Sequence, residues 1–134
     1  MTLALKKQIS YWKSESTRSF EIAQLLFKKK KRPEALFFGH LAVEKILKAL
    51  VVHSTHELAP LIHDLNRLAQ LAHLTLTHTQ QQELQMITSF NIAGRYDNDK
   101  IEFRKQCTPT FTKNQMNIIK QYYLWLNQEL SQAK

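Results

Sequence analysis

Residues 33–53 would be apolar around nearly their whole circumference if they formed a helix. Their apolar side chains are Leu36, Phe37, Phe38, Leu41, Ala42, Val43, Ile46, Leu47, Leu50, Val51 and Val52. A helix that is apolar on every side belongs in the interior, covered by other elements. Pro33 suits the first helical position, because its missing N–H is not needed there. We therefore expect a central helix from Pro33 to about His53, surrounded by other helices.

Helical spacing of apolar residues predicts a first helix over residues 3–30. The residues that carry this spacing are Leu5, Ile9, Trp12, Phe20, Ala23 and Phe27. Asp64 is a good N-cap for a short third helix. Thr79 and Gln82 have the spacing of a capping box and predict a fourth helix. Gly94 would then take the C′ position of that helix.

The last third of the chain predicts one further helix. Residues 95–110 are expected to be irregular apart from a single turn near Phe103. Thr112 and Gln115 predict the start of a final helix. Its core-facing residues would be Met116, Ile119, Tyr122, Tyr123, Leu126 and Leu130.

The composition supports an all-helical fold. The 134 residues include two glycines and three prolines, too few for the many turns of a β-sandwich. We predict a single domain over residues 1–134, of the all-α class, built as an antiparallel up-and-down bundle of four to five helices.

Three further features bear on location. The chain has no apolar run of about 18 residues, the length that a membrane span needs. Its first residues, MTLALKKQ, lack the apolar core and cleavage site of a signal peptide. Cys107 is the single cysteine, so no internal disulfide can form. We expect a cytoplasmic protein that does not interact with membranes.

The chain is strongly basic, with a formal net charge of +8 and a pI of about 9.7. Such a charge attracts polyanions and makes nucleic acid or a nucleotide a reasonable partner. The densest group of cations, Lys28–Arg32, has two interpretations. It either complements the negative end of the first helix or forms a patch that binds RNA.

Four polar side chains interrupt the apolar central helix: His40, Glu44, Lys45 and Lys48. His40, Glu44 and Lys48 are spaced i, i+4, i+8 and so lie in line on one face. Buried polar groups need partners, and Glu44 with Lys48 has the favourable order for an ion pair. Either this pair only satisfies itself, or the stripe lines a cleft or an interface.

Several kinds of site are excluded or disfavoured. Two glycines 55 residues apart cannot supply a phosphate-binding fingerprint. His53, His56 and His63 lie across a helix end and a loop rather than at a fixed spacing, so we predict no metal and no cofactor. His63 precedes the predicted cap Asp64, and an imidazole beside a carboxylate can also transfer a proton or bind phosphate.

Three segments point to a known family. They are ALFFGHLAVEKILKALVV in the central helix, LIHDLNRLAQL at the third helix, and GRYDND after the fourth. In this order they resemble the HEPN domain family (higher eukaryotes and prokaryotes nucleotide-binding), over nearly the whole chain. The resemblance implies a compact helical bundle, often a homodimer. Members are similar to companions of minimal nucleotidyltransferases in toxin–antitoxin-like pairs, or to metal-independent ribonucleases with an Arg-x(4–6)-His motif.

The resemblance assigns roles to particular residues. It implies a nucleotide-binding set of Lys45, Lys48, His63, Asp64, Arg95, Tyr96 and Asp97, supported by His40 and Glu44. We expect the charged side chains of the central helix to converge with Arg95 on one pocket, where its guanidinium would grip phosphate.

The chain departs from the ribonuclease motif, because no histidine follows Arg95. Metal-free RNA cleavage needs a group that moves a proton and a group that stabilises the phosphorane. We therefore predict a nucleotide- or partner-binding protein without the usual nuclease motif. Its expected partners are a second copy, a minimal nucleotidyltransferase, and a nucleotide or RNA. The alternative is a metal-independent endoribonuclease toxin that uses Arg95 and His63.

Overall fold

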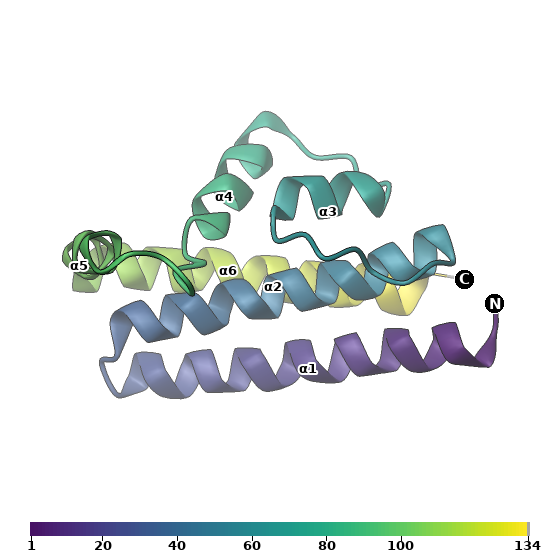
Figure 1. Ribbon diagram of the computed structural model, residues 1–134, viewed down its shortest axis with the longest axis horizontal. Helices are drawn as coiled ribbons and strands as arrows, with labels where there is room; N and C mark the ends of the chain where they lie inside the picture. The colour runs from purple at the N-terminus through teal and green to yellow at the C-terminus, as the bar shows by residue number, and fades with distance from the viewer. Residues whose placement is uncertain (134) are drawn as a thin grey trace.

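The computed structural model describes residues 1–133, and all the regular secondary structure within them is helical (Figure 1). The helices are α1 (Leu3–Lys28), α2 (Arg32–Thr55), α3 (Leu65–Leu71), α4 (His78–Thr88), α5 (Asp97–Gln106) and α6 (Pro109–Gln132). The fold class is therefore as predicted, although the described residues form six helices rather than four to five.

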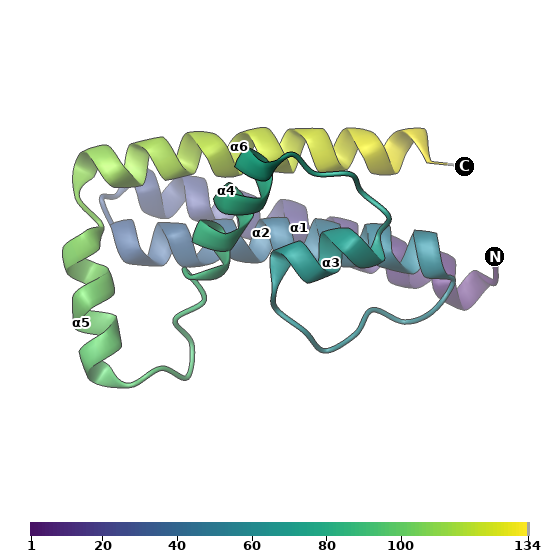
Figure 2. The same ribbon diagram turned by 90° about the horizontal axis from the view of Figure 1, so that it is seen from above.

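The three long helices run side by side, with α2 in contact with both α1 and α6. The shorter helices α3 and α4 lie across one side of this layer, and α5 crosses its end beside the turn that joins α1 to α2 (Figure 2). The central position of α2 follows from its composition, since an all-round apolar helix must be covered on every side. Fourteen of its residues are buried, so the prediction of a central helix is confirmed.

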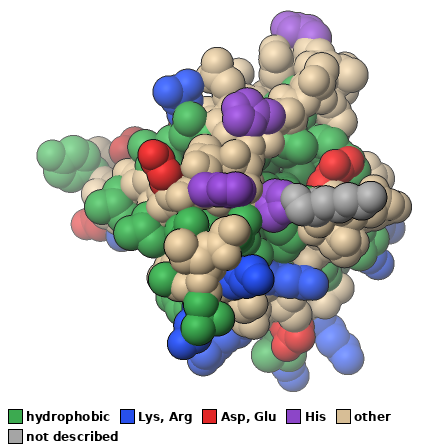
Figure 3. Space-filling view, turned by 90° about the vertical axis from the view of Figure 1, so that its right-hand side faces the viewer, with side chains coloured by type: hydrophobic (Ala, Val, Ile, Leu, Met, Phe, Trp, Pro, Cys, Tyr) green, Lys and Arg blue, Asp and Glu red, His purple; other side chains and the backbone are tan. Residues whose placement is uncertain are grey.

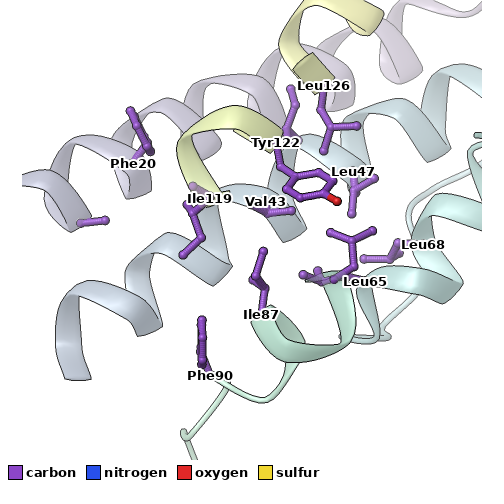
Figure 4. Packing of buried hydrophobic residues seen from close by; sticks show 14 of the residues in the cluster. Phe20, Val43, Leu47, Leu65, Leu68, Ile87, Phe90, Ile119, Tyr122 and Leu126 are labelled. Atoms are coloured by element: carbon purple, nitrogen blue, oxygen red, sulfur yellow. The ribbon is translucent and has the colours of Figure 1, made fainter. Parts of the chain in front are cut away.

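The core forms where α2, α6 and the α3–α4 pair meet (Figure 4). Val43 and Leu47 of α2 face Ile119 of α6 and Leu65 of α3 in this region. Gly39 allows α2 and α6 to approach closely, because a Cβ atom at this position would lie 2.8 Å from Cδ1 of Ile119.

Side-chain caps set several helix boundaries. Asp64 caps α3 as predicted, since its carboxylate accepts hydrogen bonds from the backbone N–H groups of Asn66 and Arg67. The capping box of α4 is formed by Thr77 and Gln80, not by Thr79 and Gln82. The segment THTQQQ contains the Thr-x-x-Gln spacing twice, two residues apart, so the spacing alone could not select the right pair.

The region after α4 differs most from expectation. α4 ends at Thr88 and is capped by Ser89, so Gly94 is not its C′ residue. Gly94 instead has a φ of 79° in the turn that leads into α5, a conformation that glycine adopts without strain.

Residues 97–106 form a helix where we expected irregular chain. Asp97 and Asp99 lie in its first turn, whereas Arg104 and Lys105 lie in its last. Both pairs complement the helix dipole, although the helix buries only Phe103. The final helix also begins earlier than predicted, because Thr108 caps it and its first residue is a proline.

Candidate functional site

The polar stripe of α2 forms a buried ionic group around Glu44. Its carboxylate lies 3.2 Å from Nζ of Lys48, 3.2 Å from Nδ1 of His63 and 3.7 Å from Nε2 of His40. We call these four residues the Glu44 cluster. Glu44 is only 4% exposed, and His40 and Lys48 are also buried. The structure thus joins the whole predicted stripe to His63, which lies on another segment.

The surroundings of Glu44 keep it ionised. Burial raises the pKa of its carboxyl group, but the contacts with His40, Lys48 and His63 together outweigh burial and lower the pKa below its ordinary value of 4.5. A buried carboxylate is tolerated when it is paired in this way. The ammonium of Lys48 also lies 5.1 Å from the ring centre of Trp12, a cation–π contact from α1.

His40 is held in one orientation. Its Nδ1 lies 2.6 Å from the carbonyl oxygen of Phe37, and a carbonyl can only accept, so Nδ1 donates this hydrogen bond. The opposite nitrogen, Nε2, therefore faces Glu44. It has no hydrogen-bond partner within residues 1–133.

His63 differs from the rest of the cluster because 61% of its side chain is exposed. It belongs to residues 56–64, which we call the strap, a segment without regular structure that leads from α2 back to α3 (Figure 2). Its Nδ1 lies 3.2 Å from both carboxylate oxygens of Glu44, and since an ionised carboxylate can only accept, Nδ1 donates to it. This contact anchors the strap, and it leaves Nε2 free to meet a ligand.

Two other predicted site residues point elsewhere. Lys45 donates a hydrogen bond of 2.9 Å to Oγ of Ser19 and lies 3.9 Å from Glu15. It therefore ties α2 to α1 and does not join the Glu44 cluster. Asp64 uses its carboxylate to cap α3, which confirms the structural role expected for it.

Arg95, Tyr96 and Asp97 lie at the start of α5. Arg95 lines a hollow of about 400 Å³ with two acidic residues, Asp99 and Glu102. Within residues 1–133, no hydrogen bond or ion pair joins Arg95 to the Glu44 cluster, and that hollow includes none of its members. The expected convergence of Arg95 with Lys48 and His63 is thus not seen within one chain. Tyr96 is 86% exposed, and Asp97 begins α5.

Cations gather at the end of the bundle where α5 lies. The turn between α1 and α2 consists of lysines, and Lys30 adopts a left-handed φ of 62°. This turn and α5 share one end of the molecule in both views (Figures 1 and 2). We call this region the basic end. Its cations are Lys28, Lys29, Lys30, Lys31, Arg32, Arg95, Lys100, Arg104 and Lys105.

An apolar groove of about 310 Å³ lies between α2 and α5. Its lining residues are Pro33, Glu34, Phe37, Phe38, Ile92, Ala93, Lys100 and Arg104. The groove adjoins the Glu44 cluster, since the rings of Phe37 and His40 have centres 5.2 Å apart. We call it the α2–α5 groove.

Neither Cys107 nor the histidines outside the Glu44 cluster form a reactive or metal-binding group within residues 1–133. Burial, with the nearby charge of Glu34, raises the pKa of Cys107 to about 11, so it is not an activated nucleophile. Histidines gather at the end opposite α5 (Figure 3), where His53, His56 and His73 line one hollow. However, residues 1–133 contain no group of three or more His, Cys, Asp or Glu that could hold a metal ion.

The fold and the Glu44 cluster define a helical-bundle domain with buried polar residues on its central helix. The HEPN domain family model matches residues 9–126, and the chain belongs to this family. Membership supports a function related to nucleotides or RNA. No curated protein and no solved structure gives a significant match to the chain. None of the described helices is long and apolar enough to cross a membrane.

Three features of the site were missed from sequence. Trp12 was assigned only to the apolar face of α1, although it contacts Lys48. Lys100 and Arg104 were placed in irregular chain, where no relation to Phe37 could be inferred. Recognising α5 as a helix, from its acidic start and basic end, would have placed these two cations one turn apart.

Proposed function

We propose that this protein is a nucleotide- or partner-binding HEPN protein that acts as a homodimer. In this proposal it is the companion of a minimal nucleotidyltransferase in a toxin–antitoxin-like pair. It binds phosphate groups through the basic end. The observation that carries the proposal is the gathering of the lysine turn and the α5 cations at one end of the bundle.

Physical chemistry supports phosphate binding at this end. Clustered lysines and arginines release condensed counterions when they bind a polyanion, which provides affinity without sequence specificity. Tyr96 is almost fully exposed and offers a ring on which a base can stack. Arg95 lies beside Asp99 and Glu102, so we assign the main attraction to the lysine turn.

Calorimetric titration with ATP, GTP and a single-stranded RNA tests this proposal. We expect binding that weakens as salt increases. Replacing Lys29, Lys30 and Lys31 by serine should abolish it. Replacing Lys6, Lys7 and Lys13 by serine is the matched control, because it removes the same charge from the first half of α1. Equal loss in both variants, or no heat from any ligand, would contradict the proposal.

The same preparation tests the partner. A nucleotidyltransferase encoded beside this chain should co-purify with it when the two are co-expressed. We do not propose a ribonuclease that uses Arg95 and His63 within one chain, because no contact in the described part of the chain brings these residues together. Cleavage of RNA that is lost in both Arg95→Ala and His63→Ala would restore that alternative.

A further inference from the structure

The strap holds one leucine almost completely in solvent. Leu61 is 95% exposed, while its neighbour Ile62 packs against the core. The next two residues anchor the strap, because His63 contacts Glu44 and Asp64 caps α3. Leu61 therefore points into solvent from a segment that these contacts hold against the bundle. The strap carries a second exposed leucine, Leu58, at 68%. Scattered exposed leucines need no explanation, so the meaning of Leu61 depends on what lies near it.

The α2–α5 groove is an apolar hollow on the same face of α2. Phe37, Leu41, Glu44 and Lys48 are spaced i, i+4, i+7, i+11, so they form one stripe along the helix. The strap contacts this stripe at Glu44 through His63. Towards the start of α2 the stripe is less covered, since Phe37 and Leu41 are only half-buried. The groove begins at Phe37.

One face thus carries an apolar projection and an apolar hollow, with half-buried Leu41 between them. The hollow is lined by the rings of Phe37 and Phe38 and by Ile92 and Ala93. Its volume of about 310 Å³ is at the lower limit of typical binding pockets. A leucine side chain is apolar and can therefore enter this apolar hollow.

The charges around the two features are opposite. Glu57 and Asp64 lie at the two ends of the strap, and both are exposed. Lys100 and Arg104 lie at the groove, which also contains one acidic residue, Glu34. A strap placed over a groove would therefore bring carboxylates close to cations. Such complementarity favours one orientation of docking over others.

We propose that this face is the interface of a twofold-symmetric homodimer, in which Leu61 of each copy enters the α2–α5 groove of the other. This inference rests on the homodimer of the proposed function and adds its interface. In a twofold interface the same patch serves both copies, so a projection and its matching hollow must occur on one face. The strap and the groove meet this condition. A different partner protein would need only one of them.

Sedimentation equilibrium of the full chain tests the interface. The wild type should sediment at twice the chain mass of 15.8 kDa. Leu61→Asp should weaken the dimer about a hundredfold or more, because two leucines lose their apolar contact in each dimer. Ala93→Asp, which changes an exposed loop residue in the groove, should have a similar effect. Leu124→Asp is the control, since it changes an exposed leucine on α6.

Mixing the two interface variants provides the decisive measurement. A Leu61→Asp chain keeps an intact groove, and an Ala93→Asp chain keeps an intact Leu61. A mixed dimer therefore retains one of its two leucine–groove contacts, and it should form at concentrations where both variants alone are monomeric. This recovery requires that Leu61 of one copy faces Ala93 of the other.

Three results would overturn the interface: a wild-type monomer at all concentrations, a Leu61→Asp dimer of undiminished affinity, or no recovery in the mixture. A variant that stays dimeric but loses a co-expressed nucleotidyltransferase would assign the face to that partner instead. Phosphate binding is measured separately on the lysine-turn variants. Undiminished nucleotide binding in these variants, with an intact dimer, would therefore refute the basic end and leave the interface standing.

Discussion

Removing the charge of Glu44 should destabilise the protein strongly. Glu44→Gln keeps the side-chain volume but withdraws the anion from Lys48 at 3.2 Å, His63 at 3.2 Å and His40 at 3.7 Å. Lys48 is buried, so its ammonium would remain in the interior without a countercharge. Breaking a buried ion pair on one side typically costs about 3–5 kcal/mol. Domains of this size are stable by only about 5–15 kcal/mol.

Urea unfolding followed by circular dichroism at 222 nm is a suitable assay, because the described fold is all helix. We expect the free energy of unfolding to fall by about 3–5 kcal/mol and the melting temperature to fall by about 10–20 °C. Glu102→Gln is the matched control. Glu102 forms an ion pair with Lys105 at 3.5 Å, and both side chains are largely exposed, so its loss should have little effect.

A double variant separates charge from packing. Glu44→Gln with Lys48→Met removes both charges and should be more stable than Glu44→Gln alone, because no unpaired ammonium remains. A Glu44→Gln protein within about 1 kcal/mol of the wild type, or a double variant no more stable than the single one, would refute the buried ion pair as a stabilising element.

Four further predictions follow from the described geometry. The pKa of Glu44 is lowered on folding, so its contribution to stability is complete above about pH 4.5 and is lost as the pH falls further. The free energies of unfolding of wild type and Glu44→Gln, measured from pH 7 to pH 3, should therefore converge in acid. A constant difference between them would contradict this. Cys107 is buried with a pKa of about 11, so a thiol reagent at pH 8 should react slowly with the folded protein and rapidly in guanidinium; equal rates would show that the thiol is accessible. Gly39→Ala should destabilise the protein by about 1 kcal/mol, because its Cβ would lie 2.8 Å from Cδ1 of Ile119. Adding Ile119→Val removes that atom and should reduce the loss of stability measured by urea unfolding. Additive effects of the two substitutions would exclude the clash. Lys30 has a left-handed φ of 62°, so Lys30→Gly should stabilise by about 1 kcal/mol whereas Lys30→Ala should not; the same urea assay compares them, and equal effects would exclude backbone strain.

The sequence was sufficient to predict the central helix and its polar stripe. The run from Leu36 to Val52 leaves no exposed face for α2, and the spacing of His40, Glu44 and Lys48 places them in line whatever surrounds them. Asp64 was also predictable, because capping depends on local chain geometry. The HEPN resemblance, carried by these same segments, is confirmed by the family match over residues 9–126.

Other features depend on tertiary structure and could not be read from local patterns. The contact between His63 and Glu44 joins residues 19 positions apart, and only the path of the strap makes it possible. The helix α5 has almost no apolar face, so periodicity gives no signal for it. Arg95 was expected beside His63 because both belong to segments that resemble the family. Belonging to such segments does not determine how far apart two residues lie in the fold.

The closed geometry of the Glu44 cluster constrains how this protein can change over generations. Positions 40, 48 and 63 all meet the carboxylate at position 44, so a substitution at position 44 alone leaves the buried charge of Lys48 without a counterion. Viable descendants must alter these positions together or in a fixed order, with Lys48 lost before Glu44. Among relatives, the four positions should therefore vary as one inherited unit, and a lineage that has lost the acid should already lack the lysine.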